Sequence, residues 1–140
     1  MAEAKASKII DVPADRVWET VRAFSHLERY FTVFVSSATE GSGVGATRTL
    51  NLPDDGGQFH ERLEALDDGS RTLTYVCLES PLPIENYVGT VTVEEAGEGK
   101  SRVTWSASFD TSAEQKPAMV AMLSDAYAGG IDGLEAMHKV

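Results

Sequence analysis

The sequence is poor in basic residues and has no long apolar run. Lys and Arg together number 12 against 22 Asp and Glu, which gives a formal net charge of −10 over 140 residues. This balance argues against nucleic-acid binding, because phosphate recognition needs clustered Lys and Arg. It also argues against docking on an anionic membrane. No stretch approaches the roughly 18 apolar residues of a membrane span, so we expect no membrane insertion.

Cysteine and histidine are also scarce. The single cysteine, Cys77, cannot form an internal disulfide, and the three histidines lie in no cluster with zinc-site spacing. We therefore expect no metal and no other cofactor. The first ten residues lack the apolar core of a secretion signal, so a reducing cytoplasm is the simplest compartment.

The familiar catalytic motifs are missing as well. There is no Gly-x-Ser-x-Gly elbow, no phosphate loop and no His-Glu-x-x-His sequence. The glycine-rich segment 41–45 precedes a predicted strand instead of opening a helix, which indicates a turn. Glu61 is the only plausible general base, through a pKa raised by burial. The sequence is compatible with an enzyme and with a protein that only binds a ligand.

The pattern of glycines and apolar residues predicts one α+β domain over residues 1–140. Glycine clusters separate short alternating segments, which is typical of an antiparallel meander. We predict a first strand at 6–11, two short helices, and six further strands. Those strands are predicted at 33–40, 44–52, 59–67, 71–78, 86–95 and 101–110.

The predicted helices follow from capping signals and apolar spacing. Pro13 opens the first helix, and Ser25 with Glu28 forms a capping-box pair for a second helix through Tyr30. A long helix is predicted from about residue 114 to 138, with Pro117 in its first turn. Its predicted inner stripe consists of Met119, Met122, Leu123, Ala126, Gly130, Leu134 and Met137. We expect a curved antiparallel sheet around this helix, the alternative being a flat sheet under it.

Small residues on the last helix suggest a cavity. Gly129, Gly130 and Gly133 each cost roughly 1 kcal/mol relative to Ala inside a helix. Ala126 and Gly130 lie on the face predicted to meet the sheet, where small side chains leave volume unfilled. The alternatives are a close approach of helix and sheet, or a helix that ends near Gly129. On the cavity interpretation, a bulky side chain at Gly130 would fill the space.

A charged pair is predicted to face inward. The apolar phase of residues 44–52 carries Arg48 inward, and the phase of Phe59, Leu63 and Ala65 carries Glu61 inward. A hairpin across residues 53–57 makes the two cross-strand neighbours. The pair could orient a polar ligand group, or it could be a structural ion pair at the edge of the sheet.

Aromatic and flexible side chains are candidates for the wall of the cavity. Tyr75, Tyr87 and Trp105 combine apolar rings with polar tips, which suits an apolar pocket with a few placed donors. Met122 suits an irregular space. For any one of these residues alone, ordinary core filling is the commoner role.

These segments together resemble one family. The sequences at 10–18 (IDVPADRVW), 43–48 (GVGATR), 61–63 (ERL), 86–90 (NYVGT) and 103–105 (VTW) carry the resemblance. They look like the polyketide cyclase/dehydrase branch of the START-like (Bet v 1-like, SRPBCC) superfamily. The resemblance implies a helix-grip fold, in which a seven-stranded antiparallel sheet grips the C-terminal helix and an apolar ligand cavity lies between them.

The chain is also distantly similar to the plant abscisic acid receptors of this superfamily. That similarity places Arg48, Glu61, Tyr87, Gly89, Met122, Ala126 and Gly130 around the cavity, with Leu52-Pro53 at the position of a gate loop. The receptors' pocket lysine matches Ser36 here, and a pocket glutamate matches Trp105. The residues 81–83 replace their latch.

The sequence therefore predicts a protein that binds or transports a small hydrophobic molecule. The predicted ligand-binding residues are Arg48, Glu61, Tyr75, Tyr87, Gly89, Trp105, Met122, Ala126 and Gly130. One alternative is a polyketide cyclase or aromatase that uses the same cavity. Another is an interaction module whose acidic surface meets a protein partner.

Overall fold

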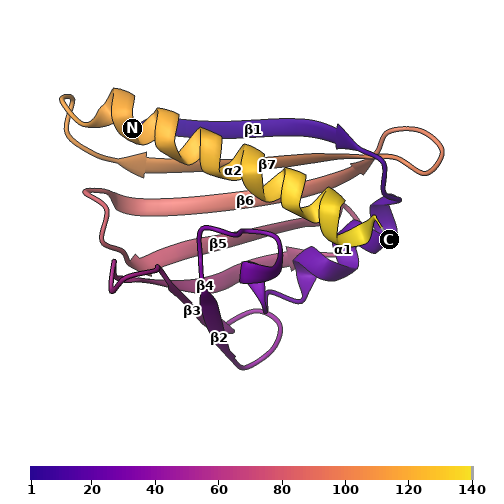
Figure 1. Ribbon diagram of the computed structural model, residues 1–140, viewed down its shortest axis with the longest axis horizontal. Helices are drawn as coiled ribbons and strands as arrows, with labels where there is room; N and C mark the ends of the chain where they lie inside the picture. Colours follow the sequence, from indigo (N-terminus) through magenta and orange to yellow (C-terminus); the bar gives the residue numbers. More distant parts are fainter. Residues whose placement is uncertain (140) are drawn as a thin grey trace.

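The computed structural model describes residues 1–139. Seven strands form one antiparallel sheet in the order β1-β7-β6-β5-β4-β3-β2, and a long helix crosses one face of it (Figure 1). The strands are β1 (Ala2–Ile10), β2 (Ser36–Glu40), β3 (Thr47–Asn51), β4 (Gln58–Asp67), β5 (Thr72–Glu79), β6 (Glu85–Glu95) and β7 (Ser101–Asp110). The helices are α1 (Ala14–Arg22), the single 3-10 turn η1 (Leu27–Arg29) and α2 (Lys116–His138). The predicted helix-grip architecture is confirmed.

Helix α2 lies along the β1–β7 side of the sheet (Figure 1). Strand β1 is an edge strand, and α2 covers it with polar contacts. The Lys5 backbone N–H donates to Ser124 Oγ at 3.2 Å, and the Asp11 N–H donates to Glu135 Oε2 at 2.8 Å. These bonds satisfy two backbone donors and hold the helix in register with the edge.

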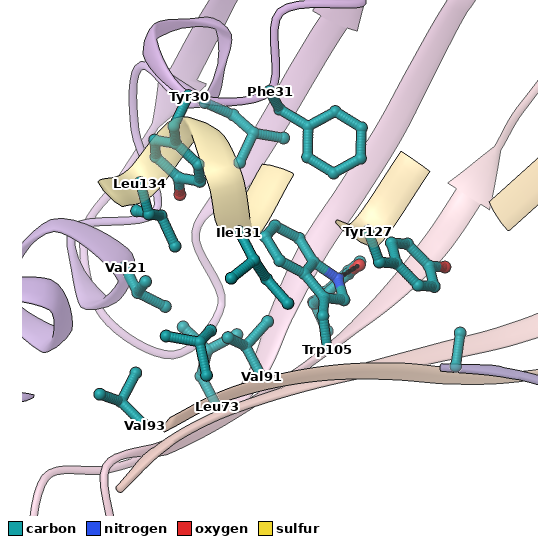
Figure 2. Close-up of a cluster of buried hydrophobic side chains, with 14 of the residues drawn as sticks. Val21, Tyr30, Phe31, Leu73, Val91, Val93, Trp105, Tyr127, Ile131 and Leu134 are labelled. Atoms are coloured by element: carbon teal, nitrogen blue, oxygen red, sulfur yellow. Dashed lines mark hydrogen bonds between the residues drawn. The ribbon is translucent and has the colours of Figure 1, made fainter. Parts of the chain in front are cut away.

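The C-terminal half of α2 is closely packed. Ile131 and Leu134 are fully buried and lie in one cluster with Val21 of α1 and with Val91 and Val93 of β6 (Figure 2). Burying each such side chain contributes roughly 1.5–3 kcal/mol. The stabilising core therefore lies at this end of the helix, away from the cavity described below.

The buried face of α2 differs from the predicted stripe. It consists of Met119, Leu123, Tyr127, Gly130, Ile131 and Leu134. Met122 is 41% exposed, and Ala126 and Met137 are only partly buried. The buried face is rotated toward Tyr127 and Ile131, which have large side chains. This face therefore does not consist mainly of small residues.

Two glycines of α2 permit a close approach to the segment after α1. A Cβ built on Gly133 would stand 1.9 Å from the Tyr30 carbonyl oxygen, and one on Gly130 would stand 2.7 Å from Cδ2 of Phe31. The expectation that Gly130 leaves open volume is therefore wrong. Its missing side chain makes room for the Phe31 ring, which is the close-approach alternative with a different partner.

Several strands begin at other residues than predicted, because pairing with a neighbouring strand sets where each one starts. Strand β1 starts at Ala2 because its whole length pairs with β7, from Ala2 opposite Phe109 to Ile10 opposite Ser101. Strands β2 and β3 are shorter than predicted, starting at Ser36 and Thr47. Pairing with a neighbour, which sequence propensity does not see, sets these limits.

Two local predictions fail. His26, in a left-handed conformation, caps η1 without a side-chain hydrogen bond, so the predicted capping box does not form. The Glu28 carboxylate instead accepts a hydrogen bond from Ser37 Oγ. In β4, a register shift between Leu63 and Ala65 turns Ala65 outward to an exposed position.

The close approach at Gly133 gives a matched pair of stability predictions. Gly133→Ala should lower the free energy of unfolding by about 1–3 kcal/mol, because the new Cβ overlaps the fixed Tyr30 backbone. Gly129→Ala should raise it by about 0.5–1 kcal/mol, since Gly129 is helical with no atom within 4 Å of its built Cβ. Urea unfolding of both variants measures the difference. Equal effects at the two sites would contradict the assignment.

Candidate functional site

An internal cavity lies between the N-terminal half of α2, the segment after η1 and the sheet. Its volume is about 200 Å³. An engineered apolar cavity of about 150 Å³ holds benzene, so this space suits a somewhat larger molecule. The side chains that line it come from every part of the fold except β1, β2 and α1. They are Leu27, Phe31, Val33, Phe34, Arg48, Leu50, Leu52, Phe59, Glu61, Tyr75, Cys77, Leu82, Ile84, Tyr87, Trp105, Met122, Leu123, Ala126 and Tyr127.

The cavity reaches solvent between α2 and the loop before β2. Val33 and Met122 both line the cavity, yet they are 49% and 41% exposed. Residues deeper in the wall, such as Leu50 and Tyr75, are 1% and 2% exposed. A small molecule therefore has a route of entry past two uncharged side chains.

One ion pair lies in the wall of this apolar space. Arg48 of β3 faces Glu61 of β4 across the hairpin, as the sequence predicted. Arg48 Nε and Nη2 each lie 2.8 Å from Glu61 Oε1, and both side chains are less than 10% exposed. Register shifts interrupt the pairing of β4 with β5 just before Glu61 and again after Leu63. Because both Arg48 contacts end on one oxygen, the second carboxylate oxygen is not used by the pair.

The surroundings hold the Arg48 guanidinium in place. Its Cζ lies 3.9 Å from the ring centroid of Phe24 and 5.1 Å from that of Tyr75. Phe24 has a φ of 58°, a left-handed conformation that is costly for a bulky residue. This backbone turn after α1 directs the Phe24 ring inward over the cation. The strain at Phe24 is thus coupled to the position of Arg48.

Burial and pairing act in opposite directions on the two charges. Burial raises the pKa of Glu61, and the Arg48 guanidinium offsets part of that rise. Burial disfavours the charge on Arg48, yet the Glu61 carboxylate holds the pKa of Arg48 above its ordinary value. The pair is therefore internally neutralised, with each charge stabilised by the other.

A chain of hydroxyl groups crosses the cavity wall from β7 to α2. Trp105 Nε1 donates to the Tyr75 hydroxyl at 2.9 Å, and that hydroxyl lies 2.9 Å from the hydroxyl of Tyr87. The Tyr87 hydroxyl in turn bonds the hydroxyl of Tyr127. Burial raises the pKa of Tyr75, Tyr87 and Tyr127, so all of these hydroxyls stay protonated near neutral pH.

Aromatic rings form a continuous wall beside the hydroxyl chain. Trp105 and Tyr127 are stacked at 5.7 Å with an interplanar angle of 6°, and the edge of Phe31 meets Trp105 at 5.3 Å (Figure 2). Phe34 continues the row, at 5.5 Å from Phe31 and 5.5 Å from Phe59. The wall favours flat, apolar molecules.

The structure brings most of the predicted ligand-binding residues together and leaves two outside. Lining the cavity are Arg48, Glu61, Tyr75, Tyr87, Trp105, Met122 and Ala126, whereas Gly89 and Gly130 do not line it. A Cβ on Gly89 would lie 2.3 Å from Cζ of Tyr75, so this glycine makes room for the Tyr75 ring. Gly89 positions a wall residue, and Gly130 admits Phe31.

Sequence reasoning missed the largest part of the aromatic wall. Tyr127 was left out of the predicted stripe, although its spacing from Leu123, Ile131 and Leu134 is helical and offered a signal. Phe31 and Phe34 lie in an irregular loop, where no periodicity indicates which side chains turn inward. Leu82 and Ile84 also lie in a loop, so periodicity gave no indication that they line the cavity.

The other reactive side chains are poorly placed for catalysis. Cys77 lines the cavity, but burial raises the pKa of its thiol to about 11, which favours the unreactive protonated form. Within residues 1–139, no group of three or more His, Cys, Asp or Glu side chains is placed to hold a metal ion. No helix in the same range is long and apolar enough to cross a membrane.

This geometry defines a helix-grip protein with an internal, partly open apolar cavity. Residues 1–138 match the family described as polyketide cyclase / dehydrase and lipid transport. The chain belongs to this family, and through it to the START-like (SRPBCC) superfamily. No curated protein sequence gives a match.

Solved structures show the same fold. The protein XoxI from Bacillus cereus is 28% identical, with a TM-score of 0.87 over 98% of this chain and 95% of its own. Major latex-like protein 151 from Panax ginseng is 22% identical, with a TM-score of 0.84 over 99% and 98%. Zhui aromatase/cyclase from Streptomyces sp. R1128 is 16% identical, with a TM-score of 0.82 over 96% and 92%. The last two likenesses concern the fold alone.

The buried ion pair gives a second prediction. Arg48→Met leaves the Glu61 carboxylate buried without its cation, which should cost about 3–5 kcal/mol of unfolding free energy. The double variant Arg48→Met with Glu61→Leu removes both charges and should recover most of that loss. Urea unfolding of wild type, single and double variants checks the cycle. A double variant as unstable as the single one would contradict it.

The stability of the Arg48→Met variant should also depend on pH in a defined direction. Arg48 lowers the pKa of Glu61, so its removal raises that pKa further above the unfolded value. The folded variant then binds more protons than the unfolded chain between those two pKa values. Its stability should therefore increase as the pH falls through that window.

Proposed function

We propose that this protein binds a small, largely hydrophobic molecule inside the cavity between α2 and the sheet. The observation that carries the proposal is an apolar space of about 200 Å³ whose wall includes residues exposed at the surface. A close-packed interior does not keep a space of this size without a reason. An apolar space with an entrance and a few placed polar groups is typical of ligand sites.

The size of the cavity limits the ligand class. Binding sites for drug-sized molecules commonly measure about 300–1,000 Å³, and this one is smaller. A molecule with one or two rings fits the volume and the aromatic wall. A long chain folded entirely inside does not fit, so carriage of a whole long-chain lipid is disfavoured.

The geometry favours binding over the alternative of a cyclase or aromatase in the same cavity. Glu61, the candidate base, is held by both nitrogen contacts from Arg48. Burial raises the pKa of Tyr75, Tyr87 and Tyr127, which makes each hydroxyl a weaker acid. A general acid or base works best with a pKa near the working pH, and these tyrosine hydroxyls lack that property.

Filling the cavity should abolish binding. Ala126→Phe places a ring in the space from α2, and Ala136→Phe makes the same change at an exposed position of that helix. Tetralin, an uncharged bicyclic hydrocarbon, is the probe, titrated by calorimetry. We expect Ala126→Phe to weaken binding by at least about tenfold, since it removes the apolar burial that drives binding. Ala136→Phe should bind like wild type, and equal losses in both variants would argue against the cavity.

Native mass spectrometry of the freshly purified protein tests the proposal independently. A co-purified small molecule that is present in wild type and absent from Ala126→Phe is expected. Absence of any bound molecule, together with no heat from tetralin in wild type, would overturn the proposed function.

A further inference from the structure

The tyrosine hydroxyls of the cavity wall supply one more proton than the hydrogen bonds between them use. What this implies about the ligand rests on the proposed function. Three tyrosine hydroxyls supply three protons, whereas only two oxygen-to-oxygen contacts join them. Trp105 Nε1 is itself a donor and takes up no proton. One hydroxyl proton is therefore available for donation outside the chain, whichever way the bonds run.

The fixed donor at Trp105 favours one direction of the chain. Because Tyr75 accepts from Trp105, its own proton is free to go to Tyr87, and the proton of Tyr87 goes to Tyr127. In this direction every hydroxyl both accepts and donates, which strengthens each bond. The Tyr75 hydroxyl oxygen also lies 2.6 Å from a Cβ built on Gly89, so it packs against the backbone at that glycine. This direction leaves the spare proton on Tyr127.

The Tyr127 hydroxyl lies at the cavity. Tyr127 is 3% exposed and lines the space, and its hydroxyl points away from the packed cluster around Ile131 and Leu134 (Figure 2). Among residues 1–139, the Tyr127 hydroxyl has Tyr87 as its hydrogen-bond partner and no acceptor beyond it. A buried donor without an acceptor is costly, so a ligand that supplies one gains affinity.

The charges of the cavity exclude a charged ligand. Arg48 is the one cation of the wall and Glu61 the one anion, and the two are bonded to each other. A carboxylate would have to share the guanidinium with Glu61, and an ammonium group would have to share the Glu61 carboxylate with Arg48, so neither would meet an uncompensated opposite charge. Either would also lose its hydration in an apolar space.

We propose that the cavity binds an uncharged ring compound whose carbonyl oxygen accepts a hydrogen bond from the Tyr127 hydroxyl. The ring packs along the row of Trp105, Phe31 and Phe34, and the carbonyl points to α2. The raised pKa of Tyr127 supports this arrangement, because the hydroxyl remains a donor near neutral pH.

Matched probes separate the carbonyl from the ring. 1-Tetralone and tetralin have the same bicyclic frame and differ by one ketone oxygen, and 1-naphthoate adds a negative charge to a frame of similar size. Calorimetry on wild type should show 1-tetralone binding about tenfold more tightly than tetralin, the value of one hydrogen bond. Tyr127→Phe should abolish that preference. Tyr30→Phe, at a buried tyrosine that does not line the cavity, should keep it.

Each outcome has a defined meaning. Equal affinity of wild type for 1-tetralone and tetralin overturns the carbonyl inference and leaves the proposed function standing. No binding of either compound overturns the proposed function itself. Binding of 1-naphthoate as tight as that of 1-tetralone overturns the exclusion of charged ligands.

A measurement on wild type keeps the test independent of the folding of Tyr127→Phe. The carbonyl carbon of ¹³C-labelled 1-tetralone should move downfield when bound, relative to its position in an apolar solvent, because its oxygen accepts a hydrogen bond. A bound carbonyl signal at the apolar-solvent position would overturn the proposal.

Discussion

The structure depends on the contact between α2 and the segment that follows α1. Gly133 lets the Tyr30 backbone approach the helix, and Gly130 admits the Phe31 ring. This contact fixes the helix at its C-terminal half, where Ile131 and Leu134 are fully buried. The helix runs straight along the side of β1 and β7, so the backbone of its N-terminal half does not pack closely on strands β3 to β5 (Figure 1). The cavity is the space that this geometry leaves, and close packing at one end maintains the opening at the other.

Polar groups inside an apolar cavity must satisfy one another or lose stability. The ion pair solves this for two charges, and the hydroxyl chain solves it for three tyrosines and Trp105. The two solutions differ in what they leave over. The ion pair neutralises its own charges and leaves only the second Glu61 oxygen outside the pair, whereas the hydroxyl chain leaves one hydroxyl proton without an acceptor in the chain. That difference gives the site its chemical preference and separates it from a plain apolar void.

The prediction of Arg48 opposite Glu61 succeeded because alternation in a strand has a period of two, and the hairpin fixes the register. The glycines were harder to interpret. A small residue on an inward face means either an empty space or a close neighbour, and the sequence around Gly130 does not show which. The neighbour is Phe31, about a hundred positions earlier in the chain, and it lies in a loop without periodicity.

The helix-grip architecture was implied by the resemblance to a known family, whereas the sequence by itself determined the order of strands and helices along the chain and the inward phase of the ion pair. Those features follow from local periodicity and from turn residues, which act over a few positions. The tertiary structure alone decided the size of the cavity, the inclusion of Tyr127 and Phe34 in its wall, and the hydrogen bond between the hydroxyls of Tyr87 and Tyr127. These depend on how α2 rotates and where a loop folds back, and both are set by packing between segments that are distant in the chain.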